Sequence, residues 1–362
     1  MQTDRIDPGF WRGRRVFVTG HTGFMGGWLC LWLCRLGAQV TGYALSPSPS
    51  PNLFEATGLA QRMRSIVADV RDLERLTAAL NDSAPDIVMH LAAQPLVGVA
   101  YREPVATFAV NVMGTVNVLQ AIRATGSVRS ALVVTTDKVY ENREWPWGYR
   151  ECDALGGHEP YGASKACAEL AVGAFRDSYF DAGRRVGIAT IRAGNIIGGG
   201  DWAANRLVPD AVRAFSAGTP LVPRNPDATR PWQHVLDPLR GYLMLAQRLT
   251  EDPAAWSGPW NFGPAEDDTL PVTAVAEELA RLWGDGARCH FQPAPDAAPD
   301  AAREARQLAL SSSQAQARLG WRPVWRLQRA LAETVAWYKA HLAQADMDSF
   351  SLRQIALVEG AN

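Results

Sequence analysis

Short runs of β-branched and apolar residues alternate with helical patterns over the first half of the chain, and this alternation limits the possible folds more than any other feature. Each run is short enough for one strand. The runs are RVFVTG, QVTGYAL, RSIVAD, DIVMHLAA, ALVVTTD and GIATIRAGN. Strands that alternate with helices pair in parallel, and helices cover both faces of their sheet. The sequence therefore predicts an α/β fold with a doubly wound parallel sheet of six or seven strands.

The pattern changes after the last of these runs, where loops rich in glycine, tryptophan and proline begin. Three further helices are expected near residues 205–216, 270–283 and 327–341. A chain of 362 residues exceeds the usual size of one core. We expect two domains, residues 1–193 and 194–362, with 232–262 returning in part to the first. Two segments of biased composition, 46–51 and 293–302, are expected to be loops.

The charge balance argues against two classes of partner. The chain has 36 Lys and Arg against 37 Asp and Glu, interspersed, so we expect no basic surface for nucleic acid or an anionic membrane. The most apolar run, residues 28–34, is far shorter than the roughly 20 residues that cross a bilayer. The N-terminal residues carry charges and lack the apolar core of a secretory signal. These features predict a cytoplasmic protein without a nucleic-acid or membrane partner.

Cysteine and histidine usage predicts neither a disulfide framework nor a metal site. Five cysteines lack any CxxC spacing, and the six histidines are dispersed. His21 and His90 follow strands and are expected to be hydrogen-bonded structural residues. The cysteines are Cys30, Cys34, Cys152, Cys167 and Cys289.

A glycine-rich loop follows the first strand. In GHTGFMG, Gly20, Gly23 and Gly26 stand between that strand and the opening of a helix. Glycines there permit a tight turn and let backbone N–H groups and the helix N-terminus approach a pyrophosphate. A glycine pattern alone is weak evidence, but the strand–turn–helix setting is the one that the motif requires. The loop predicts a Rossmann-like, dinucleotide-binding sheet.

The choice of dinucleotide is left open at one position. An acidic residue about 20 positions after the loop would hold the adenosine ribose, but the second strand ends in TGYALSPS. The next arginine is Arg62, too far along to bind a 2′-phosphate, and this favours NAD over NADP. Asp69, after the third strand, is either an adenine contact or the N-cap of the following helix.

Tyr161 and Lys165 in YGASK are four residues apart, so a helix presents both on one face. To act as a base near neutrality, the tyrosine needs its pKa lowered by about 3 units, or ~4 kcal/mol. One ammonium at ~4 Å supplies a Coulomb energy of that size at an effective dielectric of ~20. The pair follows a strand ending in TTD, and doubly wound sheets present functional groups at the carboxyl ends of their strands. We predict a catalytic Tyr–Lys pair there.

Several segments together resemble a known family. GHTGFMG, HLAAQP, Asn111 in NVMGT, and YGASK resemble the extended short-chain dehydrogenase/reductases that act on nucleotide sugars, over nearly the whole chain. TTDKVYENREWPWGYRE, RAGNIIGGGDW and RPWQHVLDPL are closer still to the CDP-glucose 4,6-dehydratases within that family. The resemblance implies bound NAD and a CDP-hexose substrate held by a smaller C-terminal substrate-binding lobe. Such lyases convert CDP-D-glucose to CDP-4-keto-6-deoxy-D-glucose through hydride transfer from carbon 4, water loss across carbons 5 and 6, and hydride return to carbon 6.

The same resemblance implies the catalytic roles. Thr136 and Tyr161 contact the sugar 4-hydroxyl, from which Tyr161 removes the proton, and Lys165 binds the nicotinamide ribose. Asp137 protonates the departing 6-hydroxyl, and Lys138 takes the proton from carbon 5. In thymidine-linked dehydratases this last position is acidic, so the lysine indicates the cytidine group or epimerising relatives. An acid role requires a protonated carboxyl and therefore a raised pKa for Asp137.

Binding residues are implied in the same way. Asn195 and Arg230 match positions that hold the diphosphate, and Gln94 and Trp202 line the sugar or the base. With 13 tryptophans in the chain, core packing is the alternative for Trp202. The substrate-binding set is Gln94, Asn195, Trp202, Arg206, Arg230 and His234. The cofactor-binding set is Gly20, Thr22, Gly23, Phe24, Met25, Gly26, Asp69, Val70, Leu91, Ala92, Ala93, Asn111, Thr135, Tyr161 and Lys165.

Departures from the family pattern fall mainly where the substrate is expected. Relatives often carry lysine at Met25 and a basic residue at Gly98. Near Arg303, Ala309 and Ser311 they usually carry a histidine, a lysine and an aspartate. The nucleotide and the sugar are therefore the least constrained part of the prediction.

The resemblance also bears on assembly and leaves two alternatives open. Relatives commonly pair through helices around 104–124 and 161–180, which implies a homodimer or homotetramer. One alternative function is an epimerase, dehydratase or reductase for another nucleotide sugar. The other is a non-catalytic dinucleotide-binding regulator, since fold alone does not establish activity.

Overall fold

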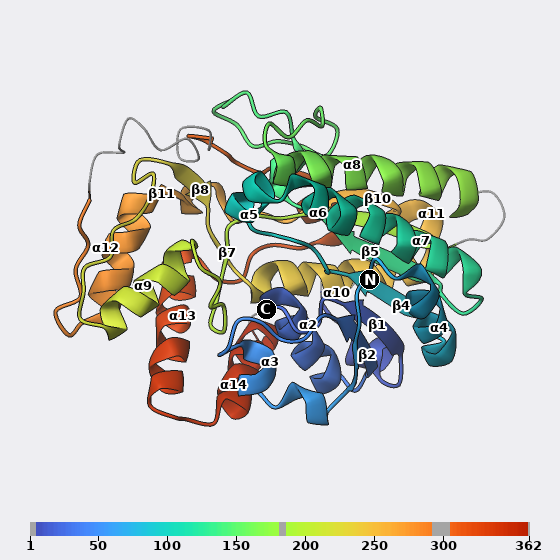
Figure 1. Cartoon of the computed structure of the whole chain (residues 1–362), viewed down its shortest axis with the longest axis horizontal. Helices are drawn as coiled ribbons and strands as arrows, with labels where there is room; N and C mark the ends of the chain where they lie inside the picture. The colour runs from blue at the N-terminus through green and yellow to red at the C-terminus, as the bar shows by residue number, and fades with distance from the viewer. Residues whose placement is uncertain (1–4, 181–185, 292–304, 361–362) are drawn as a thin grey trace.

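The computed structural model describes residues 5–180, 186–291 and 305–360. Its centre is a seven-stranded parallel sheet in the order β10-β6-β5-β4-β1-β2-β3 (Figure 1). The strands are β1 (Arg15–Thr19), β2 (Gln39–Ala44), β3 (Arg64–Val67), β4 (Ile87–His90), β5 (Ser130–Val134), β6 (Gly187–Arg192) and β10 (Gly258–Asn261). This confirms the predicted α/β, doubly wound sheet. The expected loop 293–302 and the departure at Arg303 lie outside the described residues.

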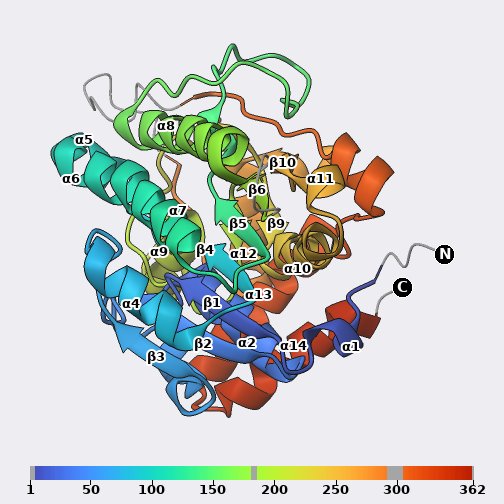
Figure 2. The ribbon, with the colours of Figure 1, turned by 90° about the vertical axis from the view of Figure 1, so that its right-hand side faces the viewer.

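Helices cover both faces of the sheet (Figure 2). α4 (Leu73–Ser83), α7 (Gly114–Ala124) and α8 (Pro160–Phe175) lie on one face, and α2 (Phe24–Arg35) and α10 (Leu236–Glu251) on the other. A separate apolar cluster fills each interface. Every residue of β4 is buried, which is why its sequence IVMH is almost continuously apolar instead of alternating.

The sequence of α2 explains its central position. FMGGWLCLWLCR is apolar almost all round, and Trp28 and Trp32 have no exposed surface. A helix that is apolar on all sides must be covered on all sides. The sheet covers one side of α2, and α14 (Met347–Gly360) packs against it as well. Trp32 Nε1 donates to Glu359 Oε1 of α14 at 2.8 Å, which satisfies its polar group.

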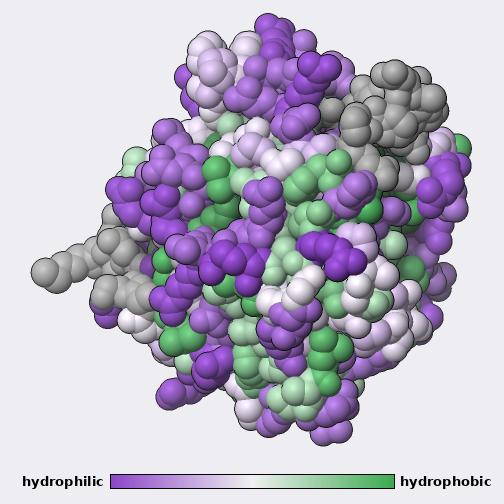
Figure 3. All heavy atoms as spheres, turned by 90° about the vertical axis from the view of Figure 1, so that its left-hand side faces the viewer, coloured by the Kyte–Doolittle hydropathy of each residue, from purple (hydrophilic) through white to green (hydrophobic). Residues whose placement is uncertain are grey.

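A smaller lobe is built from segments that follow β6 (Figure 1). Its helices are α9 (Leu207–Ser216), α12 (Val272–Trp283) and α13 (Leu327–Leu342). Its two small sheets pair β7 (Ile196–Ile197) with β9 (Gln233–His234), and β8 (Thr229–Pro231) with β11 (Thr269–Pro271). The three expected helices are thus present, whereas α14 was not expected. Hydrophilic and hydrophobic side chains are interspersed on the left-hand face of Figure 1, to which the lobe contributes (Figure 3).

One helical stretch, Pro104–Ala124, is long and apolar enough to span a membrane by those two criteria alone. In this structure it packs against α4 and α8, and its inward side carries buried Thr107 and Asn111, as in a helix of a globular core. The stretch comprises α6, η2 and α7. The remaining short elements are α1 (Pro8–Trp11), α3 (Leu53–Ala56), η1 (Leu59–Gln61), α5 (Val97–Arg102), α6 (Pro104–Phe108), η2 (Ala109–Met113), η3 (Asp137–Val139), η4 (Arg176–Phe180), α11 (Pro253–Trp256), η5 (Glu266–Asp268) and η6 (Ala315–Leu319).

Candidate active site

The glycine loop turns sharply between β1 and α2. Gly20 has φ 77°, a left-handed conformation that favours glycine. A Cβ at Gly20 would lie 2.7 Å from the Ala92 nitrogen, and one at Gly26 would lie 2.1 Å from the Gly20 oxygen. Gly23 caps α2 and has no side chain to bond the first N–H groups of that helix. The loop therefore leaves a helix N-terminus available to an anion, which fits the pyrophosphate of a dinucleotide.

The other predicted cofactor residues of this region surround the loop. The Ala92 N–H donates to Thr19 Oγ1 at 3.2 Å, and the Leu91 N–H donates to the Thr19 carbonyl at 3.1 Å. The Thr22 hydroxyl donates to the Leu45 carbonyl at 3.0 Å. These bonds hold the ends of β1, β2 and β4 together. Half-buried side chains next to them are Phe24, Met25 and Ala93.

Asp69 is engaged by a neighbouring arginine. Its carboxylate accepts the Arg71 N–H at 2.8 Å and pairs with the Arg71 guanidinium at 2.6 Å, and this hydrogen bonding lowers the pKa of Asp69. The N-cap of α4 is Asp72, which accepts the Arg75 N–H at 3.0 Å. The capping alternative for Asp69 is therefore wrong, and the adenine contact stays a prediction. Val70, the next residue, is buried.

A buried hydrogen-bond chain ties the loop after β4 to α8. Asn111 accepts the Gln94 N–H at 2.8 Å through Oδ1, and its Nδ2 donates to Ser164 Oγ at 2.9 Å. The Gln94 side chain donates to Thr107 Oγ1 at 2.9 Å and accepts the Leu96 N–H at 2.7 Å. Both amides hold the loop in place, so a substrate contact through the Gln94 side chain must compete with these bonds.

Three of the predicted catalytic residues meet at the end of β5. Thr136 and Asp137 are the second and third residues after that strand, and Tyr161 comes from the first turn of α8; all three are buried. Thr136 Oγ1 lies 3.1 Å from Asp137 Oδ1 and also hydrogen-bonds Tyr161. Lys138 is half-buried in the next position. The structure therefore brings together a phenol, a hydroxyl, a carboxyl and an ammonium at the carboxyl edge of the sheet.

Burial raises the pKa of Tyr161 to about 12, whereas a base that acts near neutrality needs a lowered pKa. The hydrogen bond with Thr136 and the charge of Arg206 lower this pKa, but by less than burial raises it. Lys165 Nζ donates to the Val134 carbonyl at 3.0 Å, and Arg206 is the cation that acts on the phenol. The prediction allowed for Coulomb attraction and left out the cost of desolvating a phenolate.

A buried ion pair that was not predicted from the sequence lies behind Lys165. Both side chains of the Glu169–Arg192 pair are 4% exposed. Arg192 donates Nε and Nη2 to the two Glu169 oxygens, each at 2.9 Å, and the hydroxyls of Thr135 and Thr190 donate to them at 2.6 and 2.7 Å. Burial lowers the pKa of Lys165 to about 8, and Glu169 acts against that shift. The available signal was the four-residue spacing of Lys165 and Glu169 on one helix face.

Asp137 lies where the ends of β5 and β6 meet. Its Oδ2 accepts Asn195 Nδ2 at 3.3 Å, and its Oδ1 accepts the Thr136 hydroxyl. Burial raises the pKa of Asp137 against the opposing charges of Lys138 and Arg230. This direction is the one that a general acid requires.

Two predicted arginines reach this centre from the lobe. Arg206 pairs with Asp201 at 2.8 Å, and its charge lowers the pKa of Tyr161. Arg230 is 4% exposed, donates to the Thr229 carbonyl at 2.9 Å, and acts on the Asp137 carboxyl. The lobe therefore contributes two positive charges that act on the site.

His234 and Trp202 lie within core packing. The His234 ring has no exposed surface and stands 4.6 Å from the Trp325 ring and 6.4 Å from the Trp28 ring, between centroids. This burial argues against the predicted contact of His234 with substrate. Trp202 is half-buried, with its ring centroid 5.5 Å from that of Trp337. This ring contact fits the packing alternative, and a substrate contact of Trp202 stays a prediction.

Two of the positions that depart from the family pattern, Ala309 and Ser311, form main-chain hydrogen bonds with Tyr149. The Tyr149 N–H donates to the Ala309 carbonyl at 3.0 Å, and the Ser311 N–H donates to the Tyr149 carbonyl at 2.9 Å. Main-chain bonds of this kind tolerate many side chains. Gly98 in α5 and Met25 in α2 are half-buried.

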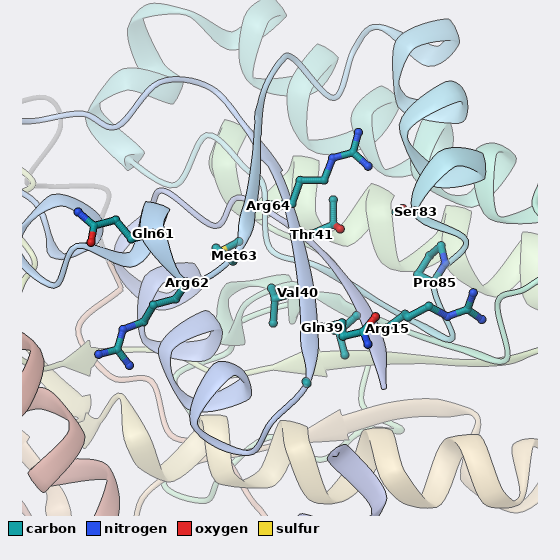
Figure 4. A pocket seen from close by; sticks show the side chains of 12 residues that line it. Arg15, Gln39, Val40, Thr41, Gln61, Arg62, Met63, Arg64, Ser83 and Pro85 are labelled. Carbon is teal, nitrogen blue, oxygen red and sulfur yellow. The ribbon is translucent and has the colours of Figure 1, made fainter. Parts of the chain in front are cut away.

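A cavity of about 500 Å³ lies at the opposite edge of the sheet, at the amino ends of β1, β2 and β3 (Figure 4). Its three arginines, Arg15, Arg62 and Arg64, pair with Asp86, Asp348 and Asp82 respectively. Its charge is balanced, and it lies away from the strand ends that carry the predicted site residues.

In the described part of the chain, His90 is hydrogen-bonded inside the core and the cysteines form no disulfide. His90 contacts Thr19 Oγ1 at 2.7 Å and Thr115 Oγ1 at 3.1 Å, and burial lowers its pKa to about 3. All five cysteines carry free thiols. Among the described residues, no group of three or more His, Cys, Asp or Glu could hold a metal ion.

Comparison with known proteins agrees with this geometry. The family model described as GDP-mannose 4,6 dehydratase matches residues 17–334. The CDP-glucose 4,6-dehydratase of Salmonella typhimurium (strain LT2) is 46% identical over 355 residues, 97% of this chain and 98% of that protein. The chain belongs to the extended short-chain dehydrogenase/reductase family of nucleotide-sugar epimerases and dehydratases. Its dinucleotide fold and its Tyr-x-x-x-Lys helix are those expected of the family.

Solved structures share the fold of this extended dehydrogenase/reductase. MoeE5 in complex with UDP-glucose and NAD is 25% identical, with a TM-score of 0.75 over 90% of this chain and 99% of that one. DesIV, a dTDP-glucose 4,6-dehydratase from Streptomyces venezuelae, is 23% identical, with a TM-score of 0.76 over 91% and 98%. The likeness extends over both the sheet and the lobe.

Proposed function

We propose that this chain is a lyase that dehydrates CDP-D-glucose to CDP-4-keto-6-deoxy-D-glucose with bound NAD. The observation that carries the proposal is its 46% identity with a CDP-glucose 4,6-dehydratase over nearly the full length of both proteins. The meeting of Thr136, Asp137 and Tyr161 at the end of β5 supports it, because the reaction needs a base and an acid beside one sugar.

The cofactor fits the glycine loop. Gly20, Gly23 and Gly26 would hold the pyrophosphate at the N-terminus of α2, with Asp69 at the adenine and Lys165 at the nicotinamide ribose. When bound, NAD accepts a hydride from carbon 4 of the sugar and returns it to carbon 6.

The side chains around the sugar would move its protons. Tyr161 takes the proton of the 4-hydroxyl, which Thr136 orients, and the charge of Arg206 favours the phenolate. The ketone formed at carbon 4 acidifies the proton on carbon 5, which Lys138 removes. Asp137, with its raised pKa, gives a proton to the departing 6-hydroxyl. Water leaves as the base and the acid act together.

The lobe would bind the nucleotide. Asn195 donates to the Asp137 carboxyl and the charge of Arg230 acts on it, which suits the proposed role of both residues in holding the diphosphate. On this basis we assign residues 1–193 to the cofactor domain and 194–362 to the nucleotide-sugar lobe, with 232–262 shared.

The outer helices would form a homodimer in the cytoplasm. α6, η2 and α8 lie side by side and expose Val105, Met113 and Leu170, whose exposed fractions are 83%, 53% and 64%. Pairing with the same surface of a second copy would bury these side chains and account for the apolar stretch Pro104–Ala124. Leu170→Glu should then shift the protein toward monomer in light scattering.

Isotope transfer tests the reaction. CDP-glucose deuterated at carbon 4 should give a 4-keto-6-deoxy sugar with deuterium at carbon 6, without added NAD. If CDP-glucose gives no product, the substrate assignment is wrong. A panel of CDP-, UDP-, GDP- and dTDP-hexoses, read by mass spectrometry, then identifies the substrate of the related epimerase, dehydratase or reductase.

A single substitution separates an enzyme from a regulator. Tyr161→Phe should abolish turnover and leave dinucleotide affinity nearly unchanged, because the phenol acts on the sugar. A regulator on this fold has no turnover to lose.

A further inference from the structure

Gly194 lies directly against the carboxyl group of Asp137. It stands two residues after β6, at the carboxyl edge of the sheet. A Cβ on Gly194 would lie 1.9 Å from Oδ2, 2.1 Å from Cγ and 2.2 Å from Oδ1 of Asp137. The carboxyl group therefore occupies the space that the first side-chain carbon of any other residue would take.

Space is the reason for glycine at this position. Gly194 is not in the left-handed conformation that by itself favours glycine, unlike its neighbour Asn195 with φ 48°. The surrounding bonds hold the same carboxyl from other sides. The Asp137 N–H donates to the Ala193 carbonyl at 3.3 Å, and Asn195 Nδ2 and the Thr136 hydroxyl donate to the two carboxyl oxygens.

We propose that Gly194 is a positioning residue for water elimination, because its missing side chain sets where the Asp137 carboxyl stands. The proposal rests on the proposed function. In that step Lys138 takes the proton from carbon 5, a double bond forms between carbons 5 and 6, and the bond from carbon 6 to oxygen breaks. The proton of Asp137 leaves with that oxygen as water.

Alanine at this position should move the acid and leave the fold intact. Contacts of about 2 Å are impossible, so the carboxyl must retreat by about 1 Å or more. The atoms that retreat are the end of a side chain, which can rotate. A misplacement of ~1 Å can slow a step about 100-fold. Hydride transfer from carbon 4 depends on Tyr161 and Thr136, so Gly194→Ala should uncouple the two steps.

The experiment compares both steps in the full-length, NAD-loaded protein with CDP-glucose. For Gly194→Ala we expect reduced nicotinamide and the 4-keto-glucose nucleotide to accumulate, with water loss slowed about 100-fold. The matched control is Gly126→Ala in the exposed loop after α7, where a Cβ meets no described atom within 4 Å and wild-type rates are expected. Wild-type water loss in Gly194→Ala, or equal loss of both steps, would overturn the proposal.

A double-mutant cycle of melting temperatures tests the same contact without an activity measurement. Any fall in melting temperature caused by Gly194→Ala should vanish in an Asp137→Ala background, since the atoms that the Cβ meets are gone. A fall of the same size in both backgrounds overturns the proposal. Failure of the proposed function gives a different result: the wild type makes no keto-sugar, or Asp137→Asn eliminates water at the wild-type rate.

Discussion

Two carboxyl groups are buried at the carboxyl edge of this sheet, and their surroundings are opposite. Glu169 accepts four hydrogen bonds of 2.6 to 2.9 Å, two of them from the Arg192 guanidinium. Asp137 accepts longer bonds of 3.1 and 3.3 Å from Thr136 and Asn195. Arg192 gives Glu169 a full counter-charge in contact, whereas burial dominates over the cations near Asp137 and raises its pKa.

The difference separates a structural ion from a candidate acid. Removing any carboxylate from water favours its neutral form, unless a partner of opposite charge offsets that cost. Glu169 has that partner and anchors the strand ends behind Lys165. Among the described residues no guanidinium forms an ion pair with Asp137, and its raised pKa favours the protonated form. A carboxyl with incomplete partners at a strand end is therefore the better candidate for proton transfer.

Asp137→Asn removes the acidic proton from the carboxyl with the raised pKa. The amide fits the same space but cannot donate an acidic proton, so water loss should slow about 10²- to 10⁴-fold while hydride transfer from carbon 4 continues. Single-turnover measurement of reduced nicotinamide and of keto-sugar checks both steps. The control is Asp82→Asn in an exposed ion pair with Arg64, which should behave as wild type.

Glu169→Gln tests the other carboxyl. It leaves the Arg192 charge buried without its counter-charge, and this should lower the free energy of unfolding by about 3–5 kcal/mol. Urea denaturation measures the change. Glu278→Gln, which breaks an exposed pair with Arg281 on α12, should have little effect. Equal midpoints for the two variants would contradict the structural role of Glu169.

A smaller loss should follow when one hydroxyl donor to Glu169 is removed. Thr135→Val deletes the 2.6 Å bond and leaves the Arg192 pair intact, so we expect about 1.5–3 kcal/mol less stability. Thr219→Val, at an exposed hydroxyl in the lobe, is the control. If Thr135→Val costs as much as Glu169→Gln, the ion pair is not the main anchor.

The smallest expected effect is a pH dependence. A raised pKa means that Asp137 binds its proton more tightly in the folded chain than in the unfolded chain. The resulting stability is fully present below its usual pKa of 3.8 and is lost as pH rises through the folded pKa. The melting temperature of Asp137→Asn minus that of the wild type should therefore increase as pH rises toward neutrality. An increase of this difference on acidification would contradict the prediction.

Much of the fold and part of the site could be predicted from local patterns. Alternation of strand and helix periods predicts the parallel sheet, and Gly20 and Gly26 show why the loop needs glycine. Tyr161 and the TTD segment were predicted to meet at the end of β5, as they do in the structure. Their catalytic roles remain predictions that the variants above test.

Two expectations left out the same quantity. The Coulomb argument for Tyr161 did not include desolvation, which raises its pKa, and the assignment of His234 to substrate did not include the full burial of its ring. Both depend on how deeply a side chain is covered. Burial depends on elements distant in the chain: the His234 ring is enclosed by Trp28 and Trp325, which no short motif connects to it.

The amino-acid sequence by itself determined the sheet, the phosphate loop and the family, because strand and helix periods, turns and motif spacing are properties of neighbouring residues. Only the tertiary structure decided that Arg192 pairs with Glu169 and that Gly194 makes room for Asp137. These partners come from different elements, and desolvation acts on a carboxyl only after those elements have packed around it.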